Sequence, residues 1–413
     1  MANVAEKARF HLERAVPQLR EFEEKEIFTK DEIRTLVSKR TEFEHLVLGP
    51  GCKPHHFRSY VAWELSLDKL RARRCLRKGI KHSSTSHASS ARVFSIYERA
   101  VLRHPASLDL WADYLDYAAR AKATKRWRKV MTRALRMHPV NPALWARAGR
   151  RAARDGDMEG ARGFFMRGCR FCNATADLWL EYARVEMEWL ARMEGKRKNK
   201  GGARKGLEEA RAEETVDDGD VLRFGEDDDD DDEFEDNEVL PDDPLADEHG
   251  RQAAKEARRA LSDEAITKLE KSPALQGAIP RAVFDAARKQ PFYSAAAAEA
   301  FFDVFAGFTA VSAQPAIIQH VLDAMADDFP RHPATCACVV RQPLVAVDVT
   351  TAEFPRALRE VLARLRAQEG VVEDRAGLAA RTVAWIRPIL KRKDLDENVR
   401  TVLEHTRRKL ENP

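Results

Sequence analysis

Leu110-Trp111-Ala112-Asp113-Tyr114 recurs 34 residues later as Leu144-Trp145-Ala146-Arg147-Ala148, and after one more such step as Leu178-Trp179-Leu180-Glu181-Tyr182. A repeated unit of this length is typical of a pair of helices that buries its apolar face only by stacking on the next pair. The repeat therefore predicts an all-α fold, an α-solenoid. Proteins of this class use their extended surfaces to bind partners.

The repeated side chains are expected to be framework rather than binding residues. Residues three apart share one face of a helix, so Trp111 and Tyr114 are expected to wedge between the two helices of their pair. Arg99, Arg133 and Arg167 follow the same step and are expected to pair with a carboxylate or a carbonyl group. The predicted framework positions, whose two glutamates are candidate partners of these arginines, are Phe57, Tyr60, Glu64, Arg99, Trp111, Tyr114, Arg133, Trp145, Arg167, Trp179, Tyr182 and Glu186.

The composition also favours helices. Charged residues make up 33% of the 413 residues, and alternating apolar patterns typical of strands are scarce. The sequence has no run of about 18 apolar residues, so no transmembrane helix is expected. The first residues do not follow the pattern of a secretory signal. The 6 cysteines do not form a disulfide framework and are expected to be reduced thiols.

Four segments are expected along the chain. They are an N-terminal helical segment (1–50), a repeat solenoid (51–194), a basic-then-acidic insertion (195–248) and C-terminal helical repeats (249–413). The insertion contains six consecutive aspartates, Asp227–Asp232, whose mutual repulsion predicts disorder. Because 248–269 again reads as helical, the insertion is expected to lie between the two helices of one repeat.

Some local expectations are less regular. Val4–Phe22 is expected to form one helix with a possible kink at Pro17. Val339–Val349 alternates β-branched residues and is expected to be extended. The 34-residue landmarks are not visible after residue 250, so repeat boundaries there stay undefined.

The net charge of +4 hides a strong asymmetry. Residues 51–205 carry a net charge of +21, whereas residues 206–250 carry −20. This separation indicates a polyanionic partner, RNA or an acidic protein segment, for which the acidic tract is a possible internal competitor. Solvated outer helix faces are the simpler explanation of the same residues. The candidate contact residues are Arg71, Arg73, Arg74, Arg77, Lys78, Lys125, Arg126, Arg128, Lys129, Arg147, Arg150 and Arg151.

Catalytic chemistry is not predicted. Cys169 and Cys172 form a Cys-x-x-Cys pair, but no second pair follows at zinc spacing, so both are expected to be core thiols. No glycine-rich loop precedes a Lys-Ser or Lys-Thr pair, as a nucleotide-phosphate site requires. We therefore expect no catalytic, metal or cofactor-binding residues, no small-molecule substrate and no enzyme activity.

Two resemblances follow from the quoted motifs. The aromatic and glutamate positions of the first helix, followed by Tyr97-Glu98-Arg99-Ala100 on the second, resemble the half-a-TPR (HAT) repeats of RNA-processing proteins. The stretches Glu26–Ile33, Lys39–Glu44 and Phe57–Glu64 resemble the U3 small nucleolar RNA-associated protein 6 family. The second resemblance covers roughly residues 1–190.

The family resemblance implies a right-handed superhelix and a non-catalytic scaffold subunit of the small-subunit processome, in its UTP-B subcomplex. The implied location is the nucleolus. The implied partners are other UTP-B subunits, including WD40-propeller proteins, together with pre-ribosomal RNA and the U3 small nucleolar ribonucleoprotein. Two alternatives stay open: a module that mainly binds RNA, and a HAT-repeat scaffold of messenger-RNA splicing or 3′-end processing.

Overall fold

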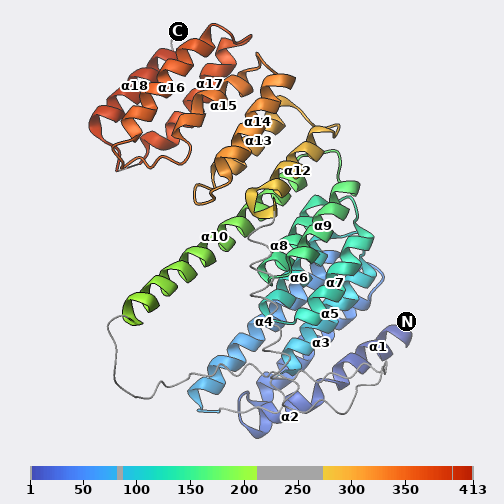
Figure 1. The fold of residues 1–413 in the computed structure, drawn as a ribbon. Helices are drawn as coiled ribbons and strands as arrows, with labels where there is room; N and C mark the ends of the chain where they lie inside the picture. Colours follow the sequence, from blue (N-terminus) through green and yellow to red (C-terminus); the bar gives the residue numbers. More distant parts are fainter. Residues whose placement is uncertain (1, 81–86, 212–272, 393, 412–413) are drawn as a thin grey trace, which may run out of the picture. The chain divides into compact units, whose positions relative to one another are not determined.

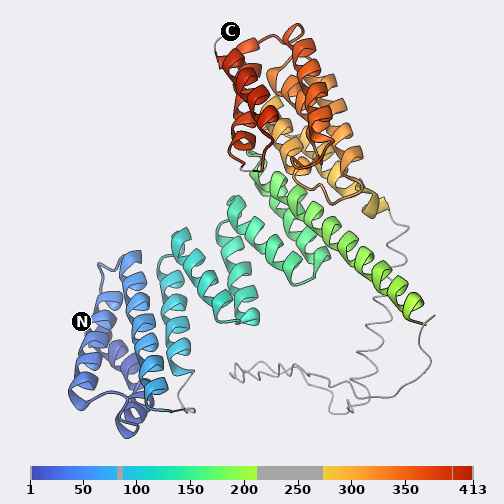
Figure 2. The same cartoon turned by 90° about the vertical axis from the view of Figure 1, so that its left-hand side faces the viewer.

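The structure is a computed structural model that describes residues 2–80, 87–211, 273–392 and 394–411. All secondary structure in these ranges is helical (Figures 1 and 2). The predicted all-α solenoid class is confirmed, whereas the superhelix handedness stays a prediction. The acidic tract and the 248–269 segment lie outside the described residues, so their expected states stay predictions.

Within the described ranges, short connections join successive helices. The N-terminal elements are α1 (Ala2–Glu13), α2 (Val16–Glu24), α3 (Lys30–Leu48), α4 (Pro54–Arg77), α5 (Ala88–Arg103), α6 (Leu108–Arg120), α7 (Thr124–Met137), α8 (Pro142–Arg154), α9 (Met158–Phe171) and α10 (Asp177–Arg211). The remaining elements are η1 (Pro273–Gln276), α12 (Ala278–Arg288), α13 (Ala295–Ala306), α14 (Gln314–Asp328), α15 (Pro333–Arg341), η2 (Gln342–Leu344), α16 (Phe354–Glu369), α17 (Arg375–Leu390) and α18 (Glu397–Glu411).

Two compact units make up the chain. The first comprises Met1–Arg151 with Met166–Cys172, and the second comprises Ala152–Phe165 with Asn173–Pro413. In the first unit α4 packs on α5 and α6 packs on α7. In the second unit the pairs are α10 with α12, α13 with α14, α15 with α16, and α17 with α18.

Three local expectations need correction. Val4–Phe22 is two helices, because the chain leaves the helix at Arg14 and restarts with Pro17 in the first turn of α2, where its missing N–H is tolerated. α10 continues through the expected start of the insertion at Gly195 to Arg211. Helix extension from an already packed segment is easier than helix nucleation, which explains this continuation.

The third correction concerns Val339–Val349. Its beginning belongs to α15 and η2, and no strand occurs there. Val340 is buried in α15, so tertiary burial outweighs the β preference of its branched side chain. Val345 has an extended backbone, but Ala346 directly after it has a φ of 70°, so the extension does not continue.

A stacked ring pair links successive repeats of the first unit. Phe43 stacks on Tyr60 with ring centroids 5.0 Å apart, and Tyr97 stacks on Tyr114 at 5.4 Å. In both pairs the tyrosine follows its partner by 17 residues. α3 therefore occupies the position of a second repeat helix, so the repeat register begins before residue 51.

A glutamate next to each stacked ring provides a second link. Glu44 accepts a hydrogen bond from the Tyr60 hydroxyl at 3.0 Å and two from the Arg99 guanidinium at 2.7 and 2.9 Å. Glu98 likewise accepts from Tyr114 at 3.2 Å and from Arg133. The carboxylate partners of Arg99 and Arg133 are therefore Glu44 and Glu98, and not the expected Glu64 or Glu186. The next repeat has Thr132 in place of Glu98, so this carboxylate is not repeated for Arg167.

Glu64 has a different partner inside the first unit. It accepts two hydrogen bonds from Arg40, at 2.8 and 3.0 Å, and both side chains are almost fully buried. Breaking such a pair would leave an uncompensated charge in a low-dielectric interior, which costs about 3–5 kcal/mol. The pair therefore fixes α3 against α4 in one register.

Backbone carbonyl groups in the turns form the third link, which we call the turn knot. The carbonyl oxygen of Pro105 accepts from Trp111 Nε1 and from His138 Nε2, each at 2.8 Å. One repeat later, the carbonyl oxygen of Pro139 accepts from Trp145 Nε1 at 2.7 Å and from Cys172 Sγ at 3.8 Å. Each knot joins a turn to the helix that follows it and to the end of the next one.

The second unit keeps the same spacings with other residues. Phe165 stacks on Tyr182 at 5.1 Å, and Phe284 meets Phe301 edge to face at 5.4 Å, again 17 residues apart. Arg162 makes two hydrogen bonds to Glu186, at 2.7 and 2.9 Å, with the sequence separation of Arg40 and Glu64. Glu186, a predicted framework residue, therefore pairs with an arginine of the second unit.

The register continues beyond residue 250, although its residue types change. His320 Nε2 lies 2.7 Å from Asp285 Oδ1, at the separation of 35 residues that also joins Arg133 to Glu98. Trp179 departs from the turn knot: in the described chain its buried Nε1 has no hydrogen-bond acceptor, and its ring lies 6.2 Å from that of Phe292. Because the side chains differ, the sequence pattern does not reveal this continuation.

The turn knot predicts a graded response to substitution of Trp145. Trp145→Ala is expected to lower the free energy of unfolding of the first unit by about 3–5 kcal/mol, because it removes a buried ring. Trp145→Phe is expected to cost about 1–3 kcal/mol, because the Pro139 carbonyl loses its indole donor. Urea unfolding with native-state hydrogen exchange measures both. Equal stability of Trp145→Phe and the wild type would show that the knot contributes nothing.

Candidate nucleic-acid interface

The structure divides the predicted basic contact residues into two groups. The first group is engaged in internal interactions. Arg74 forms two hydrogen bonds of 2.7 Å with Glu32 and lies 4.6 Å from the Phe28 ring centroid. Lys78 donates to the carbonyl oxygen of Glu26 at 2.5 Å, and Arg71 donates to Asp68 at 2.9 Å. Arg74 and Lys78 thus hold the end of α4 to residues before and within α3, whereas the Arg71 pair lies within α4.

Three further arginines also have internal roles. Arg147 pairs with Asp116 on α6. Arg151 lies 5.5 Å from the ring centroid of Trp127, and Arg126 lies 4.4 Å from that of Phe94. Cation–π contacts of this kind restrict the side chain and reduce its freedom to follow a ligand. Arg150 is exposed on the same helix as Arg147.

The second group faces solvent. Arg73 and Arg77 are exposed on α4, and Lys125, Arg128 and Lys129 are exposed on α7. Within the described ranges no ion pair is found for any of these five side chains. They are therefore the candidates that remain available to an external anion.

The α7 sequence explains its basic outer face. Its buried residues recur at helical spacing and face the core: Trp127, Val130, Met131, Ala134 and Leu135. The opposite face carries Lys125, Arg128, Lys129 and Arg136, and α7 contains no acidic residue. At a rise of about 1.5 Å per residue, this face extends for about 16 Å along the helix. We call these four residues the α7 basic strip.

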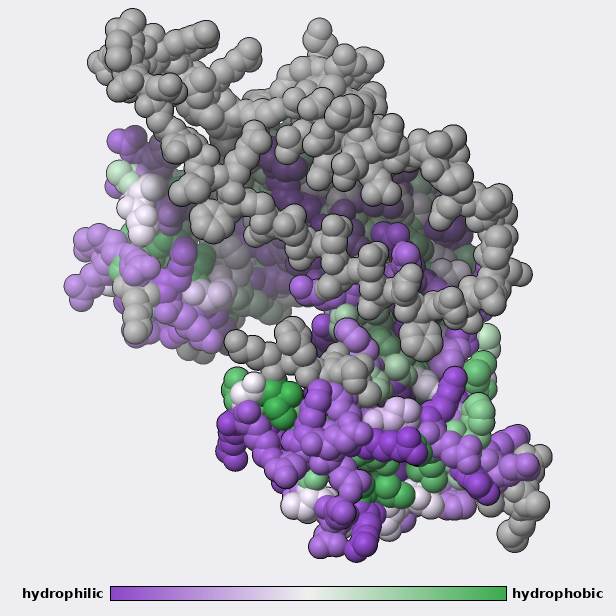
Figure 3. Space-filling view, turned by 90° about the horizontal axis from the view of Figure 1, so that it is seen from below, coloured by the Kyte–Doolittle hydropathy of each residue, from purple (hydrophilic) through white to green (hydrophobic). Residues whose placement is uncertain are grey.

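The α7 basic strip fits phosphate groups better than bases. Lysine and arginine neutralise phosphates and release counterions without reading sequence. Among the strip's own residues there is no aromatic ring on which a base could stack. The coloured part of the face drawn in Figure 3 is mostly hydrophilic, with hydrophobic residues gathered in small areas.

The paired cysteines serve the framework. Cys169 and Cys172 are buried free thiols, and burial raises the pKa of Cys169 to about 12. Cys172 takes part in the turn knot at Pro139. Among the described residues no cluster of three or more His, Cys, Asp or Glu side chains is suited to a metal ion. Of the helices in these ranges, none has the length and apolarity to cross a membrane.

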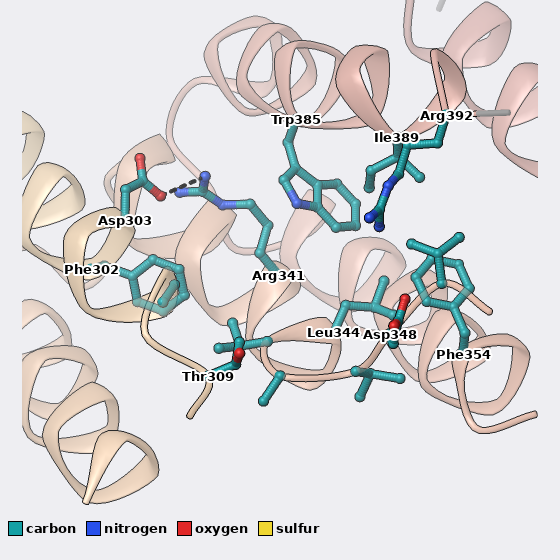
Figure 4. A pocket seen from close by; sticks show the side chains of 15 residues that line it. Phe302, Asp303, Thr309, Arg341, Leu344, Asp348, Phe354, Trp385, Ile389 and Arg392 are labelled. Atoms are coloured by element: carbon teal, nitrogen blue, oxygen red, sulfur yellow. Dashed lines mark hydrogen bonds and ion pairs between the residues drawn. The ribbon is translucent and has the colours of Figure 1, made fainter. Parts of the chain in front are cut away.

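A cavity of about 480 Å³ lies in the second unit between α13, α15 and α17 (Figure 4). Trp385 and Phe354 supply apolar walls. Arg341 donates to Asp303 at 3.0 Å and to Glu299 at 2.9 Å. The Arg341 charge is therefore neutralised by Asp303 and Glu299, which ties α15 to α13 at the wall of the cavity.

Several residues with defined roles have no counterpart among the predicted positions. Glu44, Glu98, Arg40 and Arg162 all form links between helices. A signal for two of them exists, because Glu44 and Glu98 each precede a predicted framework tyrosine by 16 residues. The acceptor groups of the turn knot are backbone carbonyls, for which side-chain patterns give no signal.

The fold and site together define a helical-repeat protein with a tightly linked N-terminal framework and a basic strip. Residues 12–94 match the family model described as U3 small nucleolar RNA-associated protein 6. This segment runs from α1 into α5 and contains Arg40, Glu44, Tyr60 and Glu64. The predicted family resemblance is confirmed for this part of the chain.

Two relatives match longer stretches of the chain. U3 small nucleolar RNA-associated protein 6 of Schizosaccharomyces pombe is 31% identical over 193 residues, which cover 46% of this chain and 40% of that protein. The human homologue of that protein is 25% identical over 187 residues, which cover 45% of this chain and 31% of the relative. The chain therefore spans less than half the length of these relatives.

The Glu32–Arg74 pair predicts a dependence of stability on pH. Hydrogen bonds from Arg74 lower the pKa of Glu32 from 4.5 to about 2. The pair therefore stabilises the fold above pH 4.5, and this contribution is lost as the pH falls toward 2. Glu32→Gln is expected to be less stable than the wild type at neutral pH, by no more than about 1 kcal/mol because solvent screens the pair.

The stability difference is expected to vanish near pH 2. Urea unfolding between pH 2 and 7 measures it. Glu13→Gln is the control, because the Arg9–Glu13 pair is highly exposed. A difference for Glu32→Gln that persists at the acid end would contradict the assigned role of Arg74.

Proposed function

We propose that the chain is a non-catalytic scaffold subunit of ribosome biogenesis. It helps to assemble the small-subunit processome on nascent pre-ribosomal RNA and thereby supports maturation of 18S ribosomal RNA. The observation that carries the proposal is the match of residues 12–94 to the U3 small nucleolar RNA-associated protein 6 family. The names of the relatives connect them to U3 small nucleolar RNA.

The finer parts of the proposal follow from the family resemblance. The chain acts within the UTP-B subcomplex in the nucleolus, beside WD40-propeller subunits and the U3 small nucleolar ribonucleoprotein. Its helix pairs are HAT repeats. The stacked helix pairs within each unit support this role, because such stacks offer large surfaces to several partners at once.

The non-catalytic part of the proposal has separate support. Polar residues of the framework form ion pairs between helices, as Glu44 does with Arg99 and Glu64 does with Arg40. Burial raises the pKa of the Cys169 and Cys338 thiols, which is the opposite of what a thiolate nucleophile needs. These features are typical of a framework.

Affinity purification tests the proposed function. The tagged full chain is expected to recover pre-ribosomal RNA and U3 small nucleolar RNA, enriched over spliceosomal small nuclear RNAs. Mass spectrometry is expected to identify WD40-propeller proteins among the co-purifying subunits. Recovery of splicing or 3′-end processing factors, with no enrichment of pre-ribosomal RNA, would favour the alternative scaffold and overturn the assignment.

The α7 basic strip supports a second function, direct contact with RNA. Four exposed cations on one helix face, with no carboxylate on that helix, produce a positive potential that attracts phosphates. This function is compatible with scaffolding, since a processome subunit works on nascent RNA.

Combined neutralisation of three strip residues tests the RNA contact. The variant Lys125→Gln, Arg128→Gln and Lys129→Gln is expected to weaken binding of single-stranded RNA and to reduce the slope of log affinity against log salt by about 2. Fluorescence anisotropy over a salt series measures both quantities. Arg126 is left intact because it packs on Phe94.

The control variant is Arg73→Gln with Arg77→Gln, which removes exposed cations from another helix. It is expected to change affinity less than the α7 variant does. Equal effects of the two variants would indicate general charge attraction, and unchanged affinity and slope would remove direct RNA contact by α7 from the account.

A further inference from the structure

Three apolar side chains are exposed around the Pro139 turn knot of the first unit. Met137 ends α7 and is 51% exposed, and Val140 follows Pro139 at 69%. Phe171 ends α9 and is 53% exposed. Three large apolar side chains are thus exposed around one hydrogen-bonded turn, and exposed apolar residues gathered in one place mark an interaction site. We call these three residues the Pro139 patch.

Two residues of the patch occupy equivalent positions in successive repeats. Met137 and Phe171 are separated by 34 residues and so occupy the same position of successive repeats. Arg136 and Arg170, each one residue earlier, are also equivalent and are both exposed. The structure thus presents an arginine and an apolar residue together at the ends of two successive second helices.

The base of the patch is rigid. Trp145 Nε1 and Cys172 Sγ both donate to the Pro139 carbonyl oxygen, at 2.7 and 3.8 Å. The Phe171 ring stacks on the Trp145 ring with centroids 6.0 Å apart and planes 10° apart. A surface whose side chains are fixed before binding loses less conformational entropy when a partner docks.

The charge at the rim has one sign. Arg136 and Arg170 flank the apolar side chains, and α7 contains no acidic residue. The one acidic residue of α9, Glu159, lies in its first turn, at the opposite end of the helix. An acidic partner therefore meets complementary charge at this edge and no local repulsion from these two helices.

We propose that the Pro139 patch, with Arg136 and Arg170, docks a segment of another protein that presents bulky apolar side chains next to carboxylates. An apolar centre with arginines at its rim is the composition of protein–protein interfaces. RNA would satisfy the arginines but leave Met137 and Val140 without an apolar complement. The proposal rests on the scaffold function and specifies the chemistry of one partner.

Site-specific crosslinking in cells tests the proposal. A photoreactive phenylalanine analogue replaces Val140 in the tagged full chain, and the same analogue replaces Leu76 as the control, because Leu76 is exposed on α4 at 83%. The expected product at position 140 is a peptide of another protein that combines apolar and acidic residues. A crosslink to RNA, to a second copy of the chain or to its own acidic tract overturns the proposal, as does a yield no higher than at Leu76.

A binding measurement then decides whether the captured peptide uses the patch. The synthetic peptide is expected to lose at least tenfold in affinity for the variant Met137→Gln with Val140→Ser, whereas Leu76→Ser leaves affinity unchanged. Arg136→Gln with Arg170→Gln is expected to weaken binding and to reduce its salt dependence. Unchanged affinity in both patch variants, with native circular dichroism and unfolding temperature, overturns the proposal.

The two proposals fail in different ways. If the tagged chain recovers splicing factors but the captured peptide still depends on Met137 and Val140, the docking site stands and the ribosome-biogenesis assignment falls. If pre-ribosomal RNA is recovered but the patch variants bind the captured peptide normally, the docking site falls and the assignment stands.

Discussion

The hydrogen bonds to the carbonyl groups of Pro105 and Pro139 fix the first unit. A stack of helix pairs has no central core, so its stability depends on how firmly each pair holds the next. A turn carbonyl that accepts from a following tryptophan and from a residue in the next helix connects three segments at one atom. The tryptophan ring that donates this hydrogen bond is also buried. Burial of the ring and the hydrogen bond of its N–H group therefore stabilise the same packing of the helices.

Carboxylates add specificity to this framework. Glu44 joins α3 to Tyr60 on α4 and to Arg99 on α5, so one side chain defines the relative positions of three helices. Buried ion pairs such as Arg40–Glu64 add little net stability but penalise every other register strongly. In the second unit Asp285 and His320 are separated by 35 residues, as Glu98 and Arg133 are in the first. The repeat spacing of this contact therefore persists although the residue types differ.

The sequence predicts the helical class and the buried aromatic positions, because Trp111 and Trp145 repeat by identity. It does not predict their hydrogen-bond acceptors, which are backbone atoms. The register after residue 250 is hidden because Phe284 and Phe301 replace the tyrosine pair. The end of α15 is misread because burial outweighs the strand preference of Val340. Charge counts likewise cannot separate Arg74, which is paired with Glu32, from Arg73, which faces solvent.

Framework and surface are thus separate: repeated residues hold the helices, while side chains that the links leave exposed define the surfaces for partners. Hydrogen exchange of the tryptophan indole N–H groups, followed by NMR in the full chain, tests this account most directly. The indoles of Trp111 and Trp145 are predicted to exchange only when the first unit unfolds, at one common rate. Exchange of either indole at the rate of a solvent-exposed tryptophan would contradict the turn knot and the framework built on it.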